Sequence, residues 1–442
     1  MLRAYKSKWI VTAAGEVLKD NMLVVDDGQV IDIIPNTEEG KYNLLKIKDF
    51  GNSVITPGFI NLLAHLQYGM TDDFKPLSFK NKLKSFFMAW KINYDMAGMP
   101  NNGYVKTMAN MYKKYFCSDR KQKINMFEEN LKEVILSGTT CIAQISKENK
   151  YFEIVNQLPI KTYLFFELFA DSLDSSKYQF KQIKNKIENL ILNKSANTFI
   201  GVAPHSISCV HKKLWKILSK YCRKNNLLML IHFAEAKEEL DWLEYGFSDI
   251  DMLHKFLGLR KLSPYQKELS PVQYLKNLDV LSKKVILANA NTLSIDELKE
   301  LVLTEAKFVY CPRYCDKALH SKQRLKDVEE IFKENYGFGT DSKYFNEDLS
   351  LQNEVNYANK ENILDFDEMI KHLTIYPARI LRLQNIIGSL EKDKHADFNV
   401  FELEEGEDYR AIFNNKKPAH VYLKGRKLVR NYKLISNIFK TK

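Results

Sequence analysis

Eight short apolar runs, separated by amphipathic segments, occupy most of this 442-residue chain. The segments between them, such as "VHKKLWKILSKYCRKNN" and "SIDELKELVLTE", carry apolar residues at helical spacing. Eight buried strands that alternate with helices are typical of a (β/α)8 barrel, a TIM barrel of the α/β class. The runs cover residues 52–61, 138–146, 160–169, 197–206, 227–236, 283–291, 306–314 and 335–342.

The two ends of the chain have a different pattern. "NMLVVDDGQVIDIIPN" near the start and "AHVYLKGRKLVRNYKL" near the end are short alternating strands joined by turns. Neither end is long enough to form a core alone. We therefore expect residues 1–55 and 388–442 to pair into one small, split β-sandwich domain beside a barrel of residues 56–387.

Composition limits the partners and the compartment that we expect. The formal net charge is +11 and the pI is near 9.0, but the excess is mostly Lys spread along the chain, so we expect no nucleic-acid partner. No window is apolar and long enough for a membrane span, and six Cys are scattered without a C-x-x-C pair. These features predict a soluble cytoplasmic protein with no membrane partner and no disulfide framework.

Polar side chains lie at the carboxyl ends of several of the apolar runs, where a barrel of this kind carries its catalytic groups. Each has a structural alternative: a histidine can be an interior residue, a His–Glu pair can bond to itself, and an aspartate can cap a helix. The polar residues are His65, His205, His232, Glu235, Asn289 and Asp341.

Seven motifs, in order and spacing, resemble landmarks of the amidohydrolase superfamily, in the branch of chlorohydrolase-like and nucleoside-type deaminases. They are "PGFINLLAHL", "GVAPHS", "LIHFAEAKEELDWL", "VILANANTLSIDEL", "VYCPRYC", "GFGTDS" and "IGSLEKDKHADFNVF". The resemblance covers essentially the whole chain. Within that branch, "HFAEAKEELDWLE" followed by "FLG" is most similar to the aminodeoxyfutalosine deaminases of menaquinone biosynthesis.

The resemblance implies one divalent metal, zinc or iron, held by His65, His232 and Asp341. It implies that Glu235 shuttles protons, so that Glu235 and Asp341 form the catalytic set. It also implies that His205 contacts the substrate and that Asn289 lies at a substrate-binding position. A small-molecule substrate and a second copy of the chain, in a homodimer, are the expected partners.

Several positions depart from the family pattern. Leu63 lies where the first histidine ligand is expected, and Asn289 lies where a strand-six histidine is expected. Gln67, Tyr310 and Ser342 are also unusual. A lost ligand costs about 3 kcal/mol, or about a hundredfold in metal affinity. A lost polarising donor costs on the order of 10² to 10³ in rate.

Two hypotheses follow. In the first, the protein is a metal-dependent hydrolase that deaminates a purine-nucleoside-like substrate such as aminodeoxyfutalosine. In the second, it is a non-catalytic binding or regulatory protein with an amidohydrolase fold, because of Leu63 and Asn289.

Two further features have no role in these hypotheses. Arg313 in "CPRYC" could bind an anionic substrate group, but we expect it to pair with a surface carboxylate. The aromatic and Lys-rich segment 74–95 is expected to form a helix over the barrel mouth.

Overall fold

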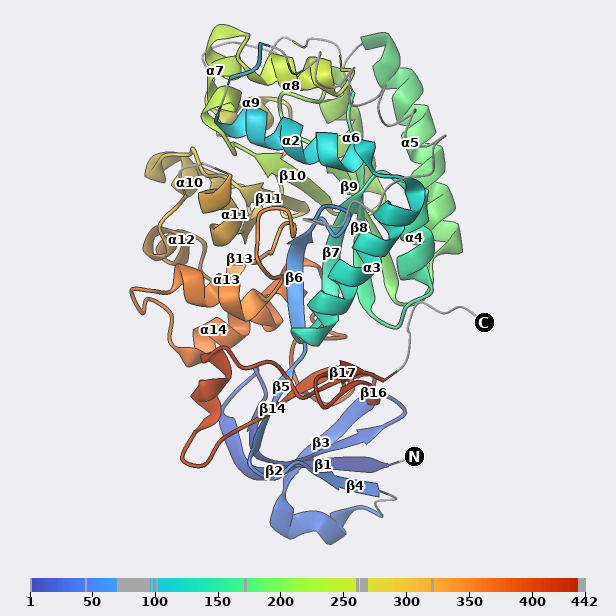
Figure 1. Ribbon diagram of the computed structural model, residues 1–442, viewed down its shortest axis with the longest axis vertical. Coiled ribbons are helices and arrows are strands. Elements are labelled where there is room, and N and C mark those ends of the chain that lie inside the picture. The colour runs from blue at the N-terminus through green and yellow to red at the C-terminus, as the bar shows by residue number, and fades with distance from the viewer. Residues whose placement is uncertain are drawn as a thin grey trace.

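Two β-sheets organise the computed structural model (Figure 1). The segment 74–95, expected to cover the barrel mouth, lies outside the described residues. The structure describes residues 2–43, 46–69, 96, 98–100, 102–170, 173–259, 262, 269–318 and 322–435.

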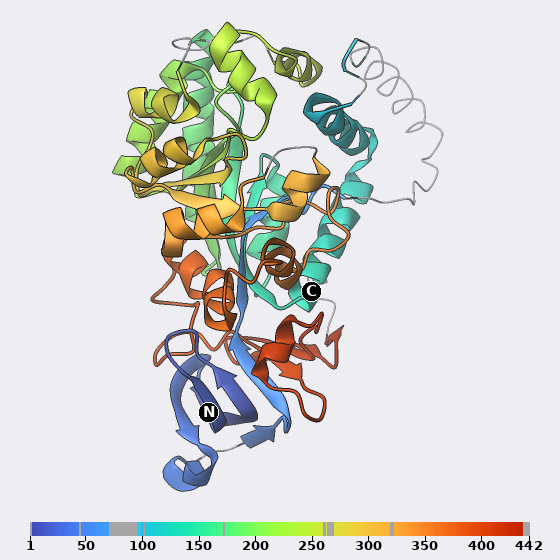
Figure 2. The same cartoon turned by 90° about the vertical axis from the view of Figure 1, so that its left-hand side faces the viewer.

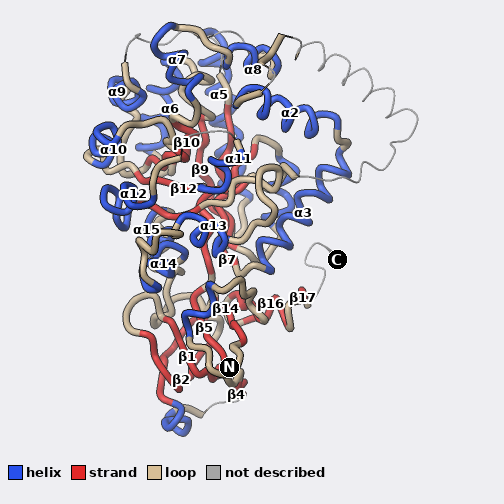
Figure 3. The backbone as a smooth tube through the Cα atoms, turned by 60° about the vertical axis from the view of Figure 1, so that its left-hand side comes forward, coloured by secondary structure: helices blue, strands red, loops and turns tan. Residues whose placement is uncertain are grey.

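The first sheet is the predicted barrel. Its eight strands are parallel and follow one another in chain order, and an isolated bridge between Ala64 and Asp341 joins its first and last members. Figure 3 shows these strands at the centre of the molecule with helices around them. The prediction of a (β/α)8 barrel is confirmed. The strands are β6 (Phe59–Ala64), β7 (Thr139–Ser146), β8 (Lys161–Leu168), β9 (Thr198–Pro204), β10 (Met229–Phe233), β11 (Val285–Asn289), β12 (Lys307–Tyr310) and β13 (Tyr336–Phe338).

The helices between the strands bury one face each. In α6, for example, Leu214, Trp215, Leu218 and Cys222 are buried at helical spacing. The helices are α2 (Tyr104–Cys117), α3 (Arg120–Leu136), α4 (Asn149–Asn156), α5 (Leu173–Asn193), α6 (Lys212–Lys224), α7 (Lys237–Tyr245), α8 (Ile250–Phe256), α9 (Pro271–Asn277), α10 (Ile295–Val302), α11 (Pro312–Lys317), α12 (Leu325–Phe332), α13 (Leu351–Ala358), α14 (Phe366–Leu373) and α15 (Ile375–Ile380).

The second sheet is built from both ends of the chain. Its order is β17-β16-β15-β14-β5-β1-β2-β3, and β4 pairs with β1. Figure 2 shows it as a separate layer below the barrel. The domain boundaries at residues 55 and 388 stay a prediction. The strands are β1 (Arg3–Val11), β2 (Val17–Asp26), β3 (Gln29–Pro35), β4 (Lys46–Asp49), β5 (Ser53–Pro57), β14 (Phe398–Glu402), β15 (His420–Leu423), β16 (Arg426–Arg430) and β17 (Lys433–Leu434).

The first apolar run contains two strands that belong to different sheets. β5 pairs with β1 and β14, whereas β6 pairs with β7, and only Gly58 separates β5 from β6. A Cβ at residue 58 would lie 2.1 Å from Oγ1 of Thr140, so only glycine permits this approach. The first barrel strand is therefore a direct continuation of the small sheet.

A buried ion pair also joins the two sheets. The Lys161 ammonium, at the start of β8, bonds the Asp397 carboxylate, just before β14, and both side chains are almost fully buried.

In the described part of the chain, no helix is both long enough and apolar enough to cross a membrane.

Candidate active site

Three predicted metal ligands lie together at the end of the barrel away from the small sheet. His65 follows β6, His232 lies in β10 and Asp341 follows β13. Their ligand atoms lie within 4.8 Å of one another, and all three side chains are buried. The arrangement arises because parallel strands of a closed barrel deliver their carboxyl ends to one place.

The two histidine rings face each other. Nε2 of His65 lies 3.1 Å from Nε2 of His232, and the rings are stacked. Two nitrogens bound to one tetrahedral zinc at 2.0–2.1 Å lie roughly 3.3 Å apart. Burial, and then the nearby His232, lowers the pKa of His65 to about 3, and burial also lowers the pKa of His232. Both rings are therefore neutral, as metal ligands must be.

Asp341 is held by the backbone of the first barrel strand. Its N–H donates to the Leu63 carbonyl at 3.0 Å, and its carbonyl accepts from the N–H of His65 at 2.7 Å. Burial, together with the neighbouring Glu235 charge, raises the pKa of Asp341 to about 7. A cation at this point would favour the ionised carboxylate. Two neutral histidines and one carboxylate form a donor set that suits zinc or ferrous iron.

Leu63 contributes no donor to this set. It is fully buried, and a Cβ on Gly339 would lie 2.7 Å from the Cβ of Leu63. The residue after β13 therefore packs directly on Leu63. Only three protein ligands are present among the described residues, the number that catalytic zinc sites use with one position left open.

Glu235 has a hydrogen-bond donor on each carboxylate oxygen. The Asn289 amide donates to Oε1, and the Tyr104 hydroxyl donates to Oε2 at 3.1 Å. The carboxylate is buried. Two donors fix the orientation of this carboxylate, a group that can act as a general acid or base.

His205 bonds a carboxylate that the sequence analysis did not single out. Nδ1 of His205 lies 2.9 Å from Oε1 of Glu167 in β8, and its ring centre lies 5.0 Å from that of His232. Burial alone would raise the pKa of Glu167, but the His205 hydrogen bond and the nearby histidine charges outweigh it and lower the pKa to about 2. An ionised Glu167 therefore orients the His205 ring.

Four residues at or just after these strand ends have a left-handed backbone conformation. Ala234, Asn289, Ala290 and Asp341 have φ values of 47°, 76°, 46° and 52°. The left-handed conformation costs an ordinary L-residue roughly 1–2 kcal/mol. Such residues cluster at functional sites, where the surrounding structure holds them in place.

The chain matches the model of the Amidohydrolase family over residues 54–428. This chain belongs to the amidohydrolase family. The family match covers β5, the entire barrel and the C-terminal strands as far as β16.

Three similar proteins illustrate the relation. The "Aminodeoxyfutalosine deaminase" of a Nitratiruptor species is 22% identical over an alignment of 426 residues that covers 94% of this chain and 96% of that protein. The crystal structure of Helicobacter pylori aminofutalosine deaminase in complex with methylthio-coformycin aligns with a TM-score of 0.75 at 19% identity, over 97% of this chain and 100% of that chain. An adenosine deaminase from Xanthomonas campestris with bound zinc has a TM-score of 0.71 at 15% identity, over 98% and 94%. At these identities the structural likeness shows the fold.

In this amidohydrolase, five of the predicted residues line one small cavity: His65, His205, His232, Glu235 and Asp341. The cavity measures about 20 Å³, which is room for about one water molecule. A nucleoside-sized ligand needs several hundred Å³. Side chains that close the cavity must therefore move before such a ligand can enter. They are Tyr68, Met108, Met111, Tyr112, Tyr314 and Phe345.

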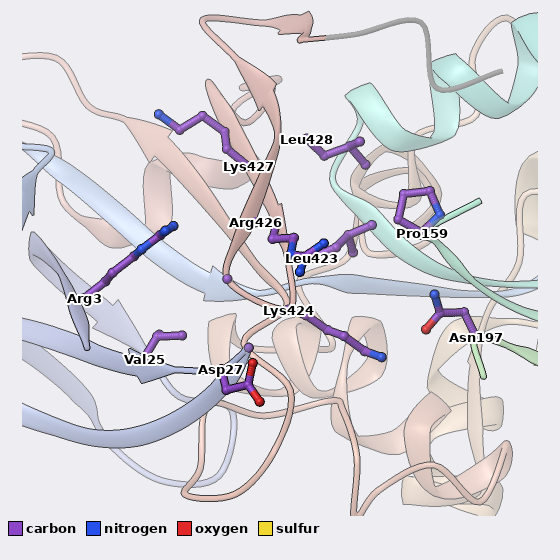
Figure 4. A pocket seen from close by; sticks show the side chains of 12 residues that line it. Arg3, Val25, Asp27, Pro159, Asn197, Leu423, Lys424, Arg426, Lys427 and Leu428 are labelled. Carbon is purple, nitrogen blue, oxygen red and sulfur yellow. The ribbon is translucent and has the colours of Figure 1, made fainter. Parts of the chain in front are cut away.

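A much larger cavity, of about 620 Å³, lies between the small sheet and the start of the barrel strands (Figure 4). It has basic walls that include Arg3, Lys424 and Lys427. Lys424 extends toward Asn197, whereas Lys427 extends to the opposite side, so the charges do not converge on one point. None of the predicted site residues lines this larger cavity.

Arg313 bonds the carboxylates of Glu354, at 2.8 Å, and Asp348, at 3.1 Å. Arg313 is therefore ion-paired, but one of its two carboxylates, Glu354, is fully buried and not at the surface. Asn289 contacts the site residues by the hydrogen bond that its amide donates to Glu235. Tyr104 and Glu167 were missed: a lone glutamate inside the apolar run "YLFFELF" was an available signal, but nothing in the sequence marked Tyr104.

Proposed function

We propose that this chain is a metal-dependent hydrolase that deaminates a purine-nucleoside-like substrate such as aminodeoxyfutalosine. The observation that carries the proposal is the Glu235 carboxylate, bonded on both oxygens, beside the His65–His232–Asp341 donor set. The names of the similar proteins support the same class of reaction.

His65, His232 and Asp341 would hold the metal, zinc or iron. When bound, such a metal lowers the pKa of a coordinated water toward neutrality. The donor set leaves room for that role because Leu63 supplies no fourth ligand.

Glu235 would move the proton. In hydrolytic deamination, water oxygen bonds to the ring carbon, the carbon–nitrogen bond breaks, and ammonia leaves. Glu235 would take one proton from the water and return it to the departing amino nitrogen. The Asn289 and Tyr104 donors would hold the carboxylate in a single orientation between these two steps.

His205 would contact the substrate. Because Glu167 accepts from Nδ1 of His205, Nε2 is the ring nitrogen of His205 that remains for a substrate contact. Substrate entry would require movement of Met108, Met111 and Tyr112 on α2. Homodimeric assembly and a cytoplasmic location stay predictions.

A non-catalytic binding or regulatory protein is the second candidate. Two observations favour it: the apolar Leu63 at a ligand position, and a cavity with room for about one water molecule. Under this hypothesis, Glu235 and its partners would be structural.

Metal content and ammonia release separate the two candidates. The full-length protein is analysed for bound zinc and iron and assayed with aminodeoxyfutalosine and with adenosine. The variants are Glu235→Gln and the double substitution Leu63→His with Asn289→His. Stoichiometric metal with ammonia release by the wild type, lost in Glu235→Gln, supports the hydrolase. Absence of metal and turnover in the wild type, with a gain in the double variant, supports the binding protein.

A further inference from the structure

Two buried glutamines lie behind His65 and are bonded to each other. Gln67 follows β6 and Gln144 lies in β7. Nε2 of Gln144 donates to Oε1 of Gln67 at 2.6 Å, and Nε2 of Gln67 lies 3.3 Å from Nδ1 of His65. Gln67 is thus the direct neighbour of a predicted metal ligand, on the side of the ring away from His232.

The direction of these hydrogen bonds is fixed from the backbone. The Leu66 N–H can only donate, and it donates to Oε1 of Gln144 at 3.1 Å. The Gln144 amide nitrogen must then point to Oε1 of Gln67 and to the Ile145 carbonyl, both at 2.6 Å. The orientation of Gln144 therefore follows without any assumption about the histidine.

Gln67 has one acceptable orientation as a result. Its amide nitrogen lies 3.1 Å from the Ile145 carbonyl, which can only accept. Turning the amide over would place two donors against each other at Gln144 and two acceptors against each other at Ile145. Gln67 must therefore donate to Nδ1 of His65.

A donor at Nδ1 decides where His65 keeps its proton. Because Nδ1 accepts, the ring proton lies on Nε2, the nitrogen 3.1 Å from Nε2 of His232. His65 then donates to His232. The electron pair through which His65 would bind a metal is occupied by a proton, whereas Nε2 of His232 keeps a lone pair.

We propose that Gln67, held by Gln144, keeps His65 in the tautomer that does not ligate and thereby weakens metal binding. The inference rests on the proposed metal site. A ligating histidine ordinarily donates its second ring N–H to a carboxylate or carbonyl, and Gln67 presents the opposite group. Metal uptake through His65 requires one proton to leave Nε2, one to be taken up at Nδ1, and the Gln67 amide to turn.

A one-atom substitution tests this inference. In Gln67→Glu the side chain keeps an acceptor for Gln144 and gains an acceptor for a proton on Nδ1 of His65. The new oxygen also faces the Ile145 carbonyl, which keeps its donor from Gln144. Zinc affinity, measured by competition with a chromophoric chelator, is expected to rise about 10- to 100-fold over wild type. Gln352→Glu is the matched control, because Gln352 is equally buried and donates to the Ile412 carbonyl instead. It should bind zinc as the wild type does.

A second measurement reads the proton directly, without metal or substrate. Ring-¹⁵N-labelled histidine in the metal-free protein distinguishes a protonated nitrogen from one with a lone pair, and His65→Gln identifies the His65 signals. The wild type is expected to show protonated Nε2, and Gln67→Glu is expected to show protonated Nδ1.

Protonated Nδ1 on His65 in the wild type would overturn the proposal. A folded Gln67→Glu protein that binds zinc no more tightly than Gln352→Glu would also overturn it. The expected tautomers together with tight zinc binding only in Gln67→Glu would support it. Tight zinc binding in Gln67→Glu without ammonia release would support this inference while counting against the proposed function.

Discussion

The residues proposed for proton transfer and those proposed for metal binding are preorganised to different degrees. On one side, Glu235 is buried and has a donor on each oxygen, which is the state a proton acceptor needs. On the other side, His65 has a donor where a ligand needs an acceptor, and Leu63 supplies no ligand. The groups proposed for proton transfer are therefore assembled in the folded chain, whereas those proposed to bind the metal require a rearrangement.

Glu235→Gln gives the largest expected effect. If Glu235 transfers the proton, kcat for ammonia release should fall about 10²- to 10⁴-fold, because no other group at that position can exchange the proton. Zinc affinity should stay within a few-fold of wild type. Glu238→Gln, three residues further along and partly exposed, serves as the control. Retention of a tenth of the wild-type kcat in Glu235→Gln would contradict the assignment.

Glu239 probes the electrostatics around Glu235. It lies four residues after Glu235, in the first turn of α7, and burial, with the Glu235 charge, raises the pKa of Glu239 to about 8. The unfolded chain releases this proton near pH 4.3, whereas the folded chain keeps it up to about pH 8. The group therefore destabilises the folded protein as the pH rises from about 4.3 to about 8, and not below pH 4.3.

Between pH 5 and pH 7.5 this destabilisation amounts to roughly 3 kcal/mol. Glu239→Gln removes it, so the free energy of unfolding of the variant, relative to wild type, should increase over this range in urea titrations. A difference that does not change with pH would show that Glu239 is ionised in the folded protein.

Leu63→His tests the proposed metal site, to which Leu63 contributes no ligand. A fourth donor should tighten zinc binding about a hundredfold. The Cβ that packs near Gly339 is retained, so the backbone has no reason to shift. Leu63→Met is the control, because it keeps a similar volume without a nitrogen donor. Equal zinc affinity in the two variants would mean that residue 63 does not face the metal.

Asn289→Ala should have the smallest effect. Loss of one donor to Glu235 is expected to lower kcat about tenfold with little change in KM, since a hydrogen bond to a charged group contributes about 1.5 kcal/mol or more. Asn289→His, which keeps a ring N–H, should lose less. An unchanged kcat in Asn289→Ala would show that Tyr104 alone is sufficient to hold the carboxylate.

The barrel could be predicted because strands buried on both faces are written as nearly continuous apolar runs. Seven of the eight runs contain a whole barrel strand, and the first run, 52–61, contains β5 and only the first three residues of β6. The division of the first run into β5 and β6 could not be predicted, since strands of the two sheets have the same apolar character there. The two strands are distinguished by their pairing partners and by the close approach of Gly58 to Thr140 between them.

Much of the site could also be predicted, because barrel topology alone brings the strand ends together. His65, His232 and Asp341 meet in this way. The contribution of Tyr104 could not be read from the sequence, because it depends on how α2 returns across the strand ends. The hydrogen-bond direction from Gln144 through Gln67 depends on side-chain rotamers, which no sequence pattern encodes.

The continuity of β5 and β6 has a consequence for synthesis on the ribosome. β5 lies between β1 and β14, and its partner residues in β14 are more than 300 positions later in the chain. At 5–20 residues per second, β5 waits about 20–70 s for its second neighbour. During that interval β5, which continues into the strand that delivers His65, is paired on one edge only. The segment through which the chain enters the barrel is thus among the last to be secured.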